Sequence, residues 1–144
     1  MSDTLHPQRM TLPSDLNSLS PLGMALRDYV APLGVAESWV YPLDLALCEA
    51  AANVILHGYP ARRDASFEVV FSQQHDAVSV TLVDSGIPIP PDKIPPAEPE
   101  ETLPLDAVMT GGRGLYLIYR CVDEVRYWQS EQGNHLMLTR RLPA

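Results

Sequence analysis

The chain has 144 residues, of which 46% are hydrophobic, and this is enough for one domain with a substantial buried core. Its formal charge of −8 comes from 10 Lys and Arg against 18 Asp and Glu, and no basic run exceeds a pair, which argues against nucleic acid as a partner. The two cysteines lie in apolar, helix-like runs and no apolar stretch is long enough to span a bilayer, so we expect a cytoplasmic protein that does not enter a membrane.

The first third of the chain predicts a short strand and two helices. Residues 1–7 are expected to form a loose tail, and residues 8–144 a single domain. A strand is predicted at Gln8–Leu12, and a helix from Ser14 or Asp15 to about Val30, because apolar residues recur there at intervals of three and four. A second helix is predicted from about Val40 to His57, with Pro42 in its first turn.

The second helix is almost entirely apolar, which is typical of a buried helix. Glu49 and Asn53 are exceptions, and they lie one turn apart on the same face. A buried carboxylate needs a polar partner, so the pair indicates either a ligand site or a face of the helix that is simply exposed. His57 at the end of this helix is interpreted as a partner of the helix dipole or as a lining residue of a pocket.

The remaining elements are a strand pair, a long irregular segment, a helix and a second strand pair. The first pair is predicted at Ser66–Ser72 and Ala77–Asp84. The segment Ile87–Thr110, which we call the lid segment, holds seven of the 14 prolines. A third helix should follow, and then strands at Glu124–Trp128 and His135–Arg141 that are joined by a turn around Gly133 and Asn134.

This order of elements predicts an α+β fold. Helices should cover one face of a mixed, mostly antiparallel sheet in a two-layer sandwich. The regular alternation of strands and helices that a doubly wound parallel fold requires is absent from the sequence.

Two further segments carry candidate binding residues. Asp84 stands at a strand end, where its carboxylate can accept a hydrogen bond from an amino group such as that of adenine, and Gly86 permits a close backbone approach. The same sequence is also typical of an ordinary turn. The run Thr110–Gly111–Gly112–Arg113–Gly114 opens a predicted helix, whose free amides favour phosphate oxygens, although it matches neither a P-loop nor a dinucleotide fingerprint.

These segments occur in a specific order: an E-x-x-x-N helix, a D-x-G strand end, a lid and a G-x-G helix start. In this respect the chain resembles the GHKL ATPase superfamily with its Bergerat fold, and within it the small bacterial anti-sigma factors that are serine protein kinases. The most similar stretches are Leu47–Tyr59 and Gly111–Tyr127, and the resemblance covers about Pro42 to Leu142.

The resemblance implies a role for each matching residue. Glu49 is similar to the general base that takes the proton from a partner's serine, and Asn53 to the ligand of a magnesium ion that bridges the phosphates of ATP. Asp84 would hold the adenine amino group, with Gly86 packed beside it. The glycines of the G-x-G pair would bring backbone amides up to the phosphates.

Three positions depart from the family pattern. Pro88 replaces the second glycine of D-x-G-x-G and should stiffen the start of the lid segment. Thr110 stands where some family kinases have a basic residue that touches the terminal phosphate, and Arg113 is the candidate substitute. Asn134 stands near the place of a threonine that lies beside the adenine in relatives, and its amide can make a similar hydrogen bond.

The resemblance implies a kinase that uses ATP and Mg²⁺ to phosphorylate a small STAS-domain antagonist and that alternates between this antagonist and a sigma factor or another regulator. The alternative is a module that binds nucleotide and sequesters a partner without catalysis, as Thr110 suggests. A homodimer through Gln8–Val30 is a further option. The acidic residues of the lid segment are expected to face solvent or a basic partner, and they are Asp92, Glu98, Glu100, Glu101 and Asp106.

Overall fold

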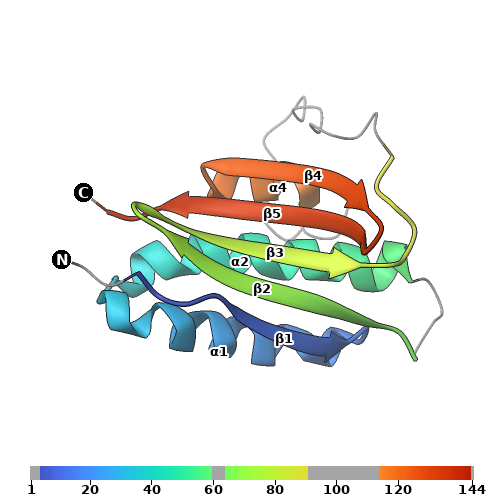
Figure 1. Ribbon diagram of the computed structural model, residues 1–144, viewed down its shortest axis with the longest axis horizontal. Helices are drawn as coiled ribbons and strands as arrows, with labels where there is room; N and C mark the ends of the chain where they lie inside the picture. Colours follow the sequence, from blue (N-terminus) through green and yellow to red (C-terminus); the bar gives the residue numbers. More distant parts are fainter. Residues whose placement is uncertain (1–3, 60–63, 91–113, 144) are drawn as a thin grey trace.

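The computed structural model describes residues 4–59, 64–90 and 114–143. A five-stranded sheet with the order β1-β2-β3-β5-β4 is covered on one face by the helices (Figure 1). Its strands are β1 (Gln8–Pro13), β2 (Ser66–Gln74), β3 (Ala77–Asp84), β4 (Glu124–Ser130) and β5 (Gly133–Arg141). Every neighbouring pair of these strands is antiparallel, and the predicted α+β sandwich is confirmed.

The first helix follows the prediction closely. A short 3-10 turn, η1 (Leu16–Ser18), leads into α1 (Leu19–Val30), and the Asp15 side chain caps the turn by accepting a hydrogen bond of 2.8 Å from the Asn17 backbone N–H. Another 3-10 turn, η2 (Ala31–Leu33), ends at Gly34, whose φ of 68° favours glycine.

The central helix α2 (Glu37–Asn53) begins three residues before the predicted start, so Pro42 lies inside the helix and not in its first turn. The first turn of α2 is hydrogen-bonded to the last strand of the sheet, because the Trp39 indole donates to the Arg141 carbonyl at 2.6 Å. Arg140 Nε donates to the Trp39 carbonyl at 3.0 Å, next to the point where the proline interrupts the helical hydrogen bonding. These long-range contacts extend the helix beyond what its sequence pattern indicates.

The end of the central helix also differs from the prediction. A π-helical turn, η3 (Val54–Gly58), follows α2 directly, so Asn53 closes the regular helix where a continuous helix to His57 was expected. Such turns are rare and frequently occur at functional sites.

By length and composition alone, the 22 residues of Glu37–Gly58 are apolar enough to cross a membrane. More than half of the most apolar stretch of this helix, 56%, is buried inside the fold, as is usual for the core helix of a globular domain. The largest fully buried side chains of α2 are Leu43 and Leu47.

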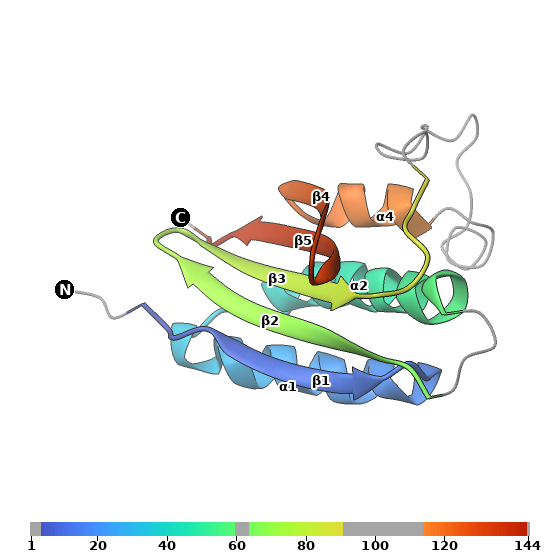
Figure 2. The same cartoon turned by 45° about the vertical axis from the view of Figure 1, so that its right-hand side comes forward.

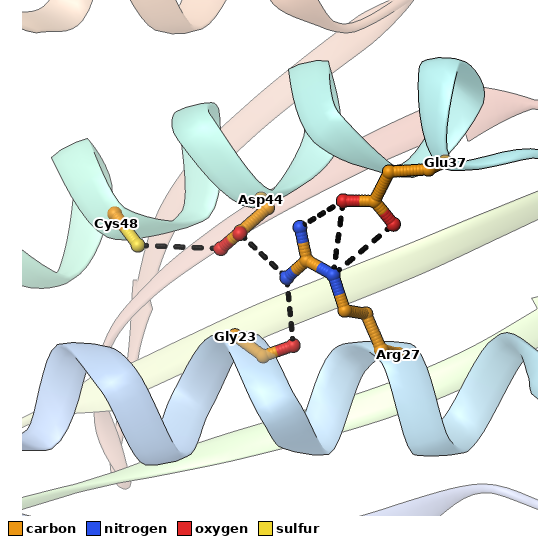
Figure 3. A network of polar contacts seen from close by, with 5 residues as sticks. All are labelled: Gly23, Arg27, Glu37, Asp44 and Cys48. Carbon is orange, nitrogen blue, oxygen red and sulfur yellow. Dashed lines mark hydrogen bonds and ion pairs between the residues drawn. The ribbon is translucent and has the colours of Figure 1, made fainter.

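Helices α1 and α2 are joined by a polar network (Figure 3). The Arg27 guanidinium donates to Glu37, to Asp44 Oδ2 at 2.7 Å and to the Gly23 carbonyl at 3.2 Å. The Cys48 thiol donates to the other oxygen of Asp44 at 3.3 Å. The half-buried Asp44 is therefore neutralised and hydrogen-bonded on both oxygens.

The last hairpin turns earlier than predicted. Ser130 of β4 pairs with Gly133 of β5, so the turn consists of Glu131 and Gln132, and Asn134 lies inside β5. Gly133 has a φ of 126°, and a Cβ there would lie 2.1 Å from the Asp84 carbonyl oxygen, so only glycine fits.

Candidate functional site

A cavity of about 340 Å³ lies where the end of α2, the end of β3 and the start of α4 (Gly114–Cys121) meet. These elements converge in Figure 2, where α2 and α4 lie behind the strands. The cavity is lined by Ala50, Asn53, Val54, His57, Gly58, Asp84, Ile87, Pro88, Ile89, Pro90, Leu115, Tyr127 and Leu136. Its walls are mainly apolar with a few polar groups, as is common in small-molecule sites.

Asn53 and Asp84 line the same cavity, although 30 residues and a strand pair separate them in the chain. The Asn53 amide nitrogen is buried and has no hydrogen-bond partner within the described residues. A buried donor without a partner is costly, so this amide is suited to a ligand that enters the cavity. Its carboxamide oxygen is of the type that Mg²⁺ prefers.

Asp84 is buried and held by two hydrogen bonds to one oxygen. Its Oδ1 accepts from the Gly86 backbone N–H at 2.9 Å and from the Asn134 amide at 3.0 Å. The same Asn134 amide also donates to the Gly86 carbonyl at 3.0 Å. Among the described residues Oδ2 has no donor, which leaves it available to an amino group of a ligand.

The position of Asn134 follows from the register of the sheet, since β3 and β5 place it directly opposite Asp84. In the structure its amide orients Asp84 and the turn after β3. From the sequence, Asn134 was expected near a bound adenine, and its described contact is with the Asp84 carboxylate.

Gly86 is required by a close contact with the backbone of Gly58. A Cβ on Gly86 would lie 2.3 Å from the Gly58 carbonyl oxygen. The same oxygen accepts the Ile87 N–H at 2.8 Å. From the sequence, Gly86 was expected to permit close approach of an adenine ring, whereas its described neighbour is Gly58 in the π turn that follows α2.

Glu49 lies one turn before Asn53, is only 6% exposed and is not among the residues that line the cavity. Burial raises the pKa of its carboxyl group. The pKa of the Cys121 thiol on α4 is raised first by burial and, to a smaller extent, by the negative charge of Glu49. No hydrogen bond joins the Glu49 carboxylate to the described part of the chain.

The remaining predicted residues belong to the glycine-rich helix start. Thr110, Gly111, Gly112 and Arg113 lie outside the described residues, as do the acidic residues of the lid segment. Gly114 is the first residue of α4, and Leu115 directly after it lines the cavity. The amino terminus of α4 therefore borders the site.

Two tyrosines that were not predicted as site residues bind backbone N–H groups beside the cavity. The Tyr59 hydroxyl accepts the Ser85 N–H at 2.6 Å, and the Tyr127 hydroxyl accepts the Ile89 N–H at 2.8 Å. Burial raises the pKa of Tyr127. His57 lines the cavity, which was one of its two interpretations. The signal in the sequence that could have indicated Tyr127 is the alternation of side chains along β4, which places Tyr127 on the less exposed face of the strand.

A model of the histidine kinase-like ATPase domain family matches residues 12–140. The chain belongs to this family. The shared domain accounts for nearly the whole described structure, from the end of β1 to β5.

Curated relatives of this ATPase domain are named as serine-protein kinases. RsbW of Bacillus velezensis is 26% identical over 99% of this chain and 89% of its own length. RsbW of Bacillus licheniformis is 27% identical over 92% of this chain and 84% of its own. Among solved structures, the RsbU and RsbW domains of Rv1364c from Mycobacterium tuberculosis match with a TM-score of 0.65 and 21% identity, covering 96% of this chain and 34% of that longer one.

Proposed function

We propose that the chain is an ATP- and Mg²⁺-dependent serine protein kinase and anti-sigma-type regulator of the cytoplasm. The observation that supports this most directly is the shared cavity of Asn53 and Asp84, with the buried Glu49 one helical turn from Asn53. This arrangement occurs in an ATPase domain whose curated relatives are serine-protein kinases over nearly their whole length.

The proposed nucleotide site uses the apolar walls of the cavity for the base. Asp84 Oδ2 would accept the exocyclic amino group of adenine, because Oδ1 already accepts two protein donors. The start of α4 borders the same cavity, and in this proposal its backbone amides would contact phosphate oxygens. The proposed contacts of Gly112 and Arg113 with the phosphates rest on the sequence.

Asn53 would hold Mg²⁺ through its carboxamide oxygen. The bound ion would neutralise part of the phosphate charge that develops during transfer. The Asn53 amide nitrogen, which has no partner among the described residues, would then gain an acceptor, such as a phosphate oxygen or a water molecule of the ion.

Glu49 would act as general base and accept the proton of the attacking serine hydroxyl. Its raised pKa makes the ionised carboxylate a better proton acceptor than an exposed glutamate. The serine oxygen would form the new bond to the γ-phosphorus while ADP departs, so the protein contributes position, charge and one proton acceptor.

The proposed substrate is the serine of a STAS-domain antagonist, and a sigma factor or another regulator would be the alternative partner. The proposal also includes a homodimer of this chain that forms through Gln8–Val30. The rival function is nucleotide-dependent sequestration without transfer, which also agrees with Glu49 not being among the described residues that line the cavity.

The test combines labelled ATP, Mg²⁺ and the STAS-domain partner with wild-type protein and with the variants Glu49→Ala, Glu49→Gln and Asn53→Ala. The Glu49 variants should bind nucleotide but transfer label at least about 100-fold more slowly, since a general base contributes that much or more. Glu131→Gln, in the exposed hairpin turn, is the control. Undiminished transfer by Glu49→Ala would exclude Glu49 as base. Nucleotide binding by the wild type without any transfer would favour the sequestration module.

A further inference from the structure

The segment Ser85–Pro90, which we call the pocket wall, follows β3 and includes the start of the lid segment, and its residues 87–90 line one side of the cavity. In Figure 1 it continues from the end of β3, near the end of α2, and runs upward past the end of β4; Figure 2 shows the same segment leaving the end of β3. Ile87 on this wall is 62% exposed.

Each backbone N–H of the pocket wall has a partner. The donors and acceptors are Ser85 to the Tyr59 hydroxyl at 2.6 Å, Gly86 to Asp84 Oδ1 at 2.9 Å, Ile87 to the Gly58 carbonyl at 2.8 Å and Ile89 to the Tyr127 hydroxyl at 2.8 Å. The other two residues, Pro88 and Pro90, have no N–H and a fixed φ. An irregular segment with this many constraints has lost most of its conformational freedom in the folded protein.

The two ends of the wall are held from different parts of the fold. The beginning is held by Tyr59 and Gly58, which follow α2, and by Asp84 of β3. The Ile89 end has one described anchor, the Tyr127 hydroxyl on the edge strand β4. Tyr127 also lines the cavity, so one residue contacts the wall and borders the space for a ligand.

We propose that Tyr127 is a positioning residue for the nucleotide: its hydroxyl holds the Ile89 end of the pocket wall in place, so that the cavity is shaped before the ligand arrives. This inference rests on the proposed nucleotide-binding function. Neither the resemblance to the family nor the names of the relatives assigns such a role to this residue.

The physical reason is preorganisation. If the Ile89 end detaches in a fraction of the molecules, the apparent dissociation constant rises by the inverse of the fraction that remains competent. A wall that is already in place spares the ligand this cost. Because the wall adjoins Asp84, the proposed adenine contact, its effect should be independent of the number of phosphates.

The first experiment compares Tyr127→Phe with Tyr41→Phe. Phenylalanine keeps the aromatic ring and removes the hydroxyl, which accepts the Ile89 N–H and also interacts with the Gln129 side chain. Tyr41 is 52% exposed on α2 and serves as a matched control. Hydrogen exchange without nucleotide should show a protected Ile89 amide in the wild type and in Tyr41→Phe, and a loss of protection in Tyr127→Phe. Equal protection in all three proteins would refute the anchor itself, whatever the protein binds.

The second experiment is calorimetric titration of the same three proteins with ATP, ADP and AMP in the presence of Mg²⁺. For Tyr127→Phe the dissociation constants should rise roughly tenfold, equivalent to the loss of one hydrogen bond, and by the same factor for all three nucleotides. Unchanged constants, or a loss that grows with the number of phosphates, would overturn the positioning role.

Pro88→Gly gives an independent variant, because it loosens the wall while all four anchors stay present. It should weaken binding of all three nucleotides as well. If it does so while Tyr127→Phe binds normally, the wall matters but Tyr127 does not hold it, and the inference fails. A wild type that binds none of the nucleotides would refute the proposed function and the nucleotide role of Tyr127, whereas the exchange experiment would still decide the anchor.

Discussion

Gly86 and Gly58 touch each other beside the cavity, and replacing each by alanine should have different effects on stability. A Cβ on Gly86 would lie 2.3 Å from the carbonyl oxygen of Gly58 and 2.6 Å from its carbonyl carbon, both of them backbone atoms that cannot rotate away. A Cβ on Gly58 would have its nearest neighbour at 3.7 Å, an ordinary contact with Asp84.

The expected cost of Gly86→Ala has two parts. Overpacking against backbone typically costs about 1–3 kcal/mol, and the displaced Gly58 carbonyl would lose the Ile87 hydrogen bond, for a further ~1 kcal/mol. The sum of about 2–4 kcal/mol should lower the melting temperature by roughly 6–12 °C for a chain of this size. Gly58→Ala should stay within about 1 kcal/mol of the wild type, since alanine also lowers the backbone entropy of the unfolded chain.

The assay is urea unfolding followed by circular dichroism, together with thermal melting, on the wild type and both variants without nucleotide. The slope of the free energy of unfolding against urea should be the same in all three proteins, and only the midpoints should differ. A Gly86→Ala midpoint equal to that of Gly58→Ala would show that the two backbones are not in the described contact.

Three further predictions concern ionisable groups. Burial raises the pKa of Glu49 in the folded protein, so its ionised form destabilises the fold. Glu49→Gln should therefore raise the free energy of unfolding at pH 8, and this gain should vanish as the pH falls below the pKa of the carboxyl group in the unfolded chain. A gain that does not depend on pH would contradict the burial effect. Arg27→Ala should lower the free energy of unfolding by about 1 kcal/mol, because Asp44 loses its charged partner. Arg126→Ala, which removes an exposed ion pair, should lower it little. Equal losses of the two variants in urea unfolding would argue against a special role of the Arg27 network. Burial first, and then Asp44, raise the pKa of the Cys48 thiol to about 12, so alkylation at pH 8 should label Cys48 only after unfolding, and rapid labelling of the native protein would disprove this shielding.

Several features of the site could be predicted from residue spacing alone. Glu49 and Asn53 share a helix face because an α-helix repeats every 3.6 residues, and that relation survives any small error in the helix ends. Asp84 was placed at a strand end from the alternation before it and the turn residues after it, and β3 ends at this residue. Where the ends of an element depend on distant contacts the prediction was less accurate, as at the start of α2, which Trp39 anchors to the last strand.

The sequence by itself therefore determined the order of the elements, the two-layer architecture and the local geometry of the polar pairs, because these depend on backbone periodicity and on a few neighbouring residues. Only the tertiary structure decided which distant groups meet. The antiparallel register of β3 and β5 places Asn134 on Asp84, and a π turn brings Gly58 against Gly86. The hydroxyl of Tyr127 reaches the pocket wall because β4 lies beside it in the folded sheet. Such contacts depend on the packing of the whole chain, which no local pattern encodes.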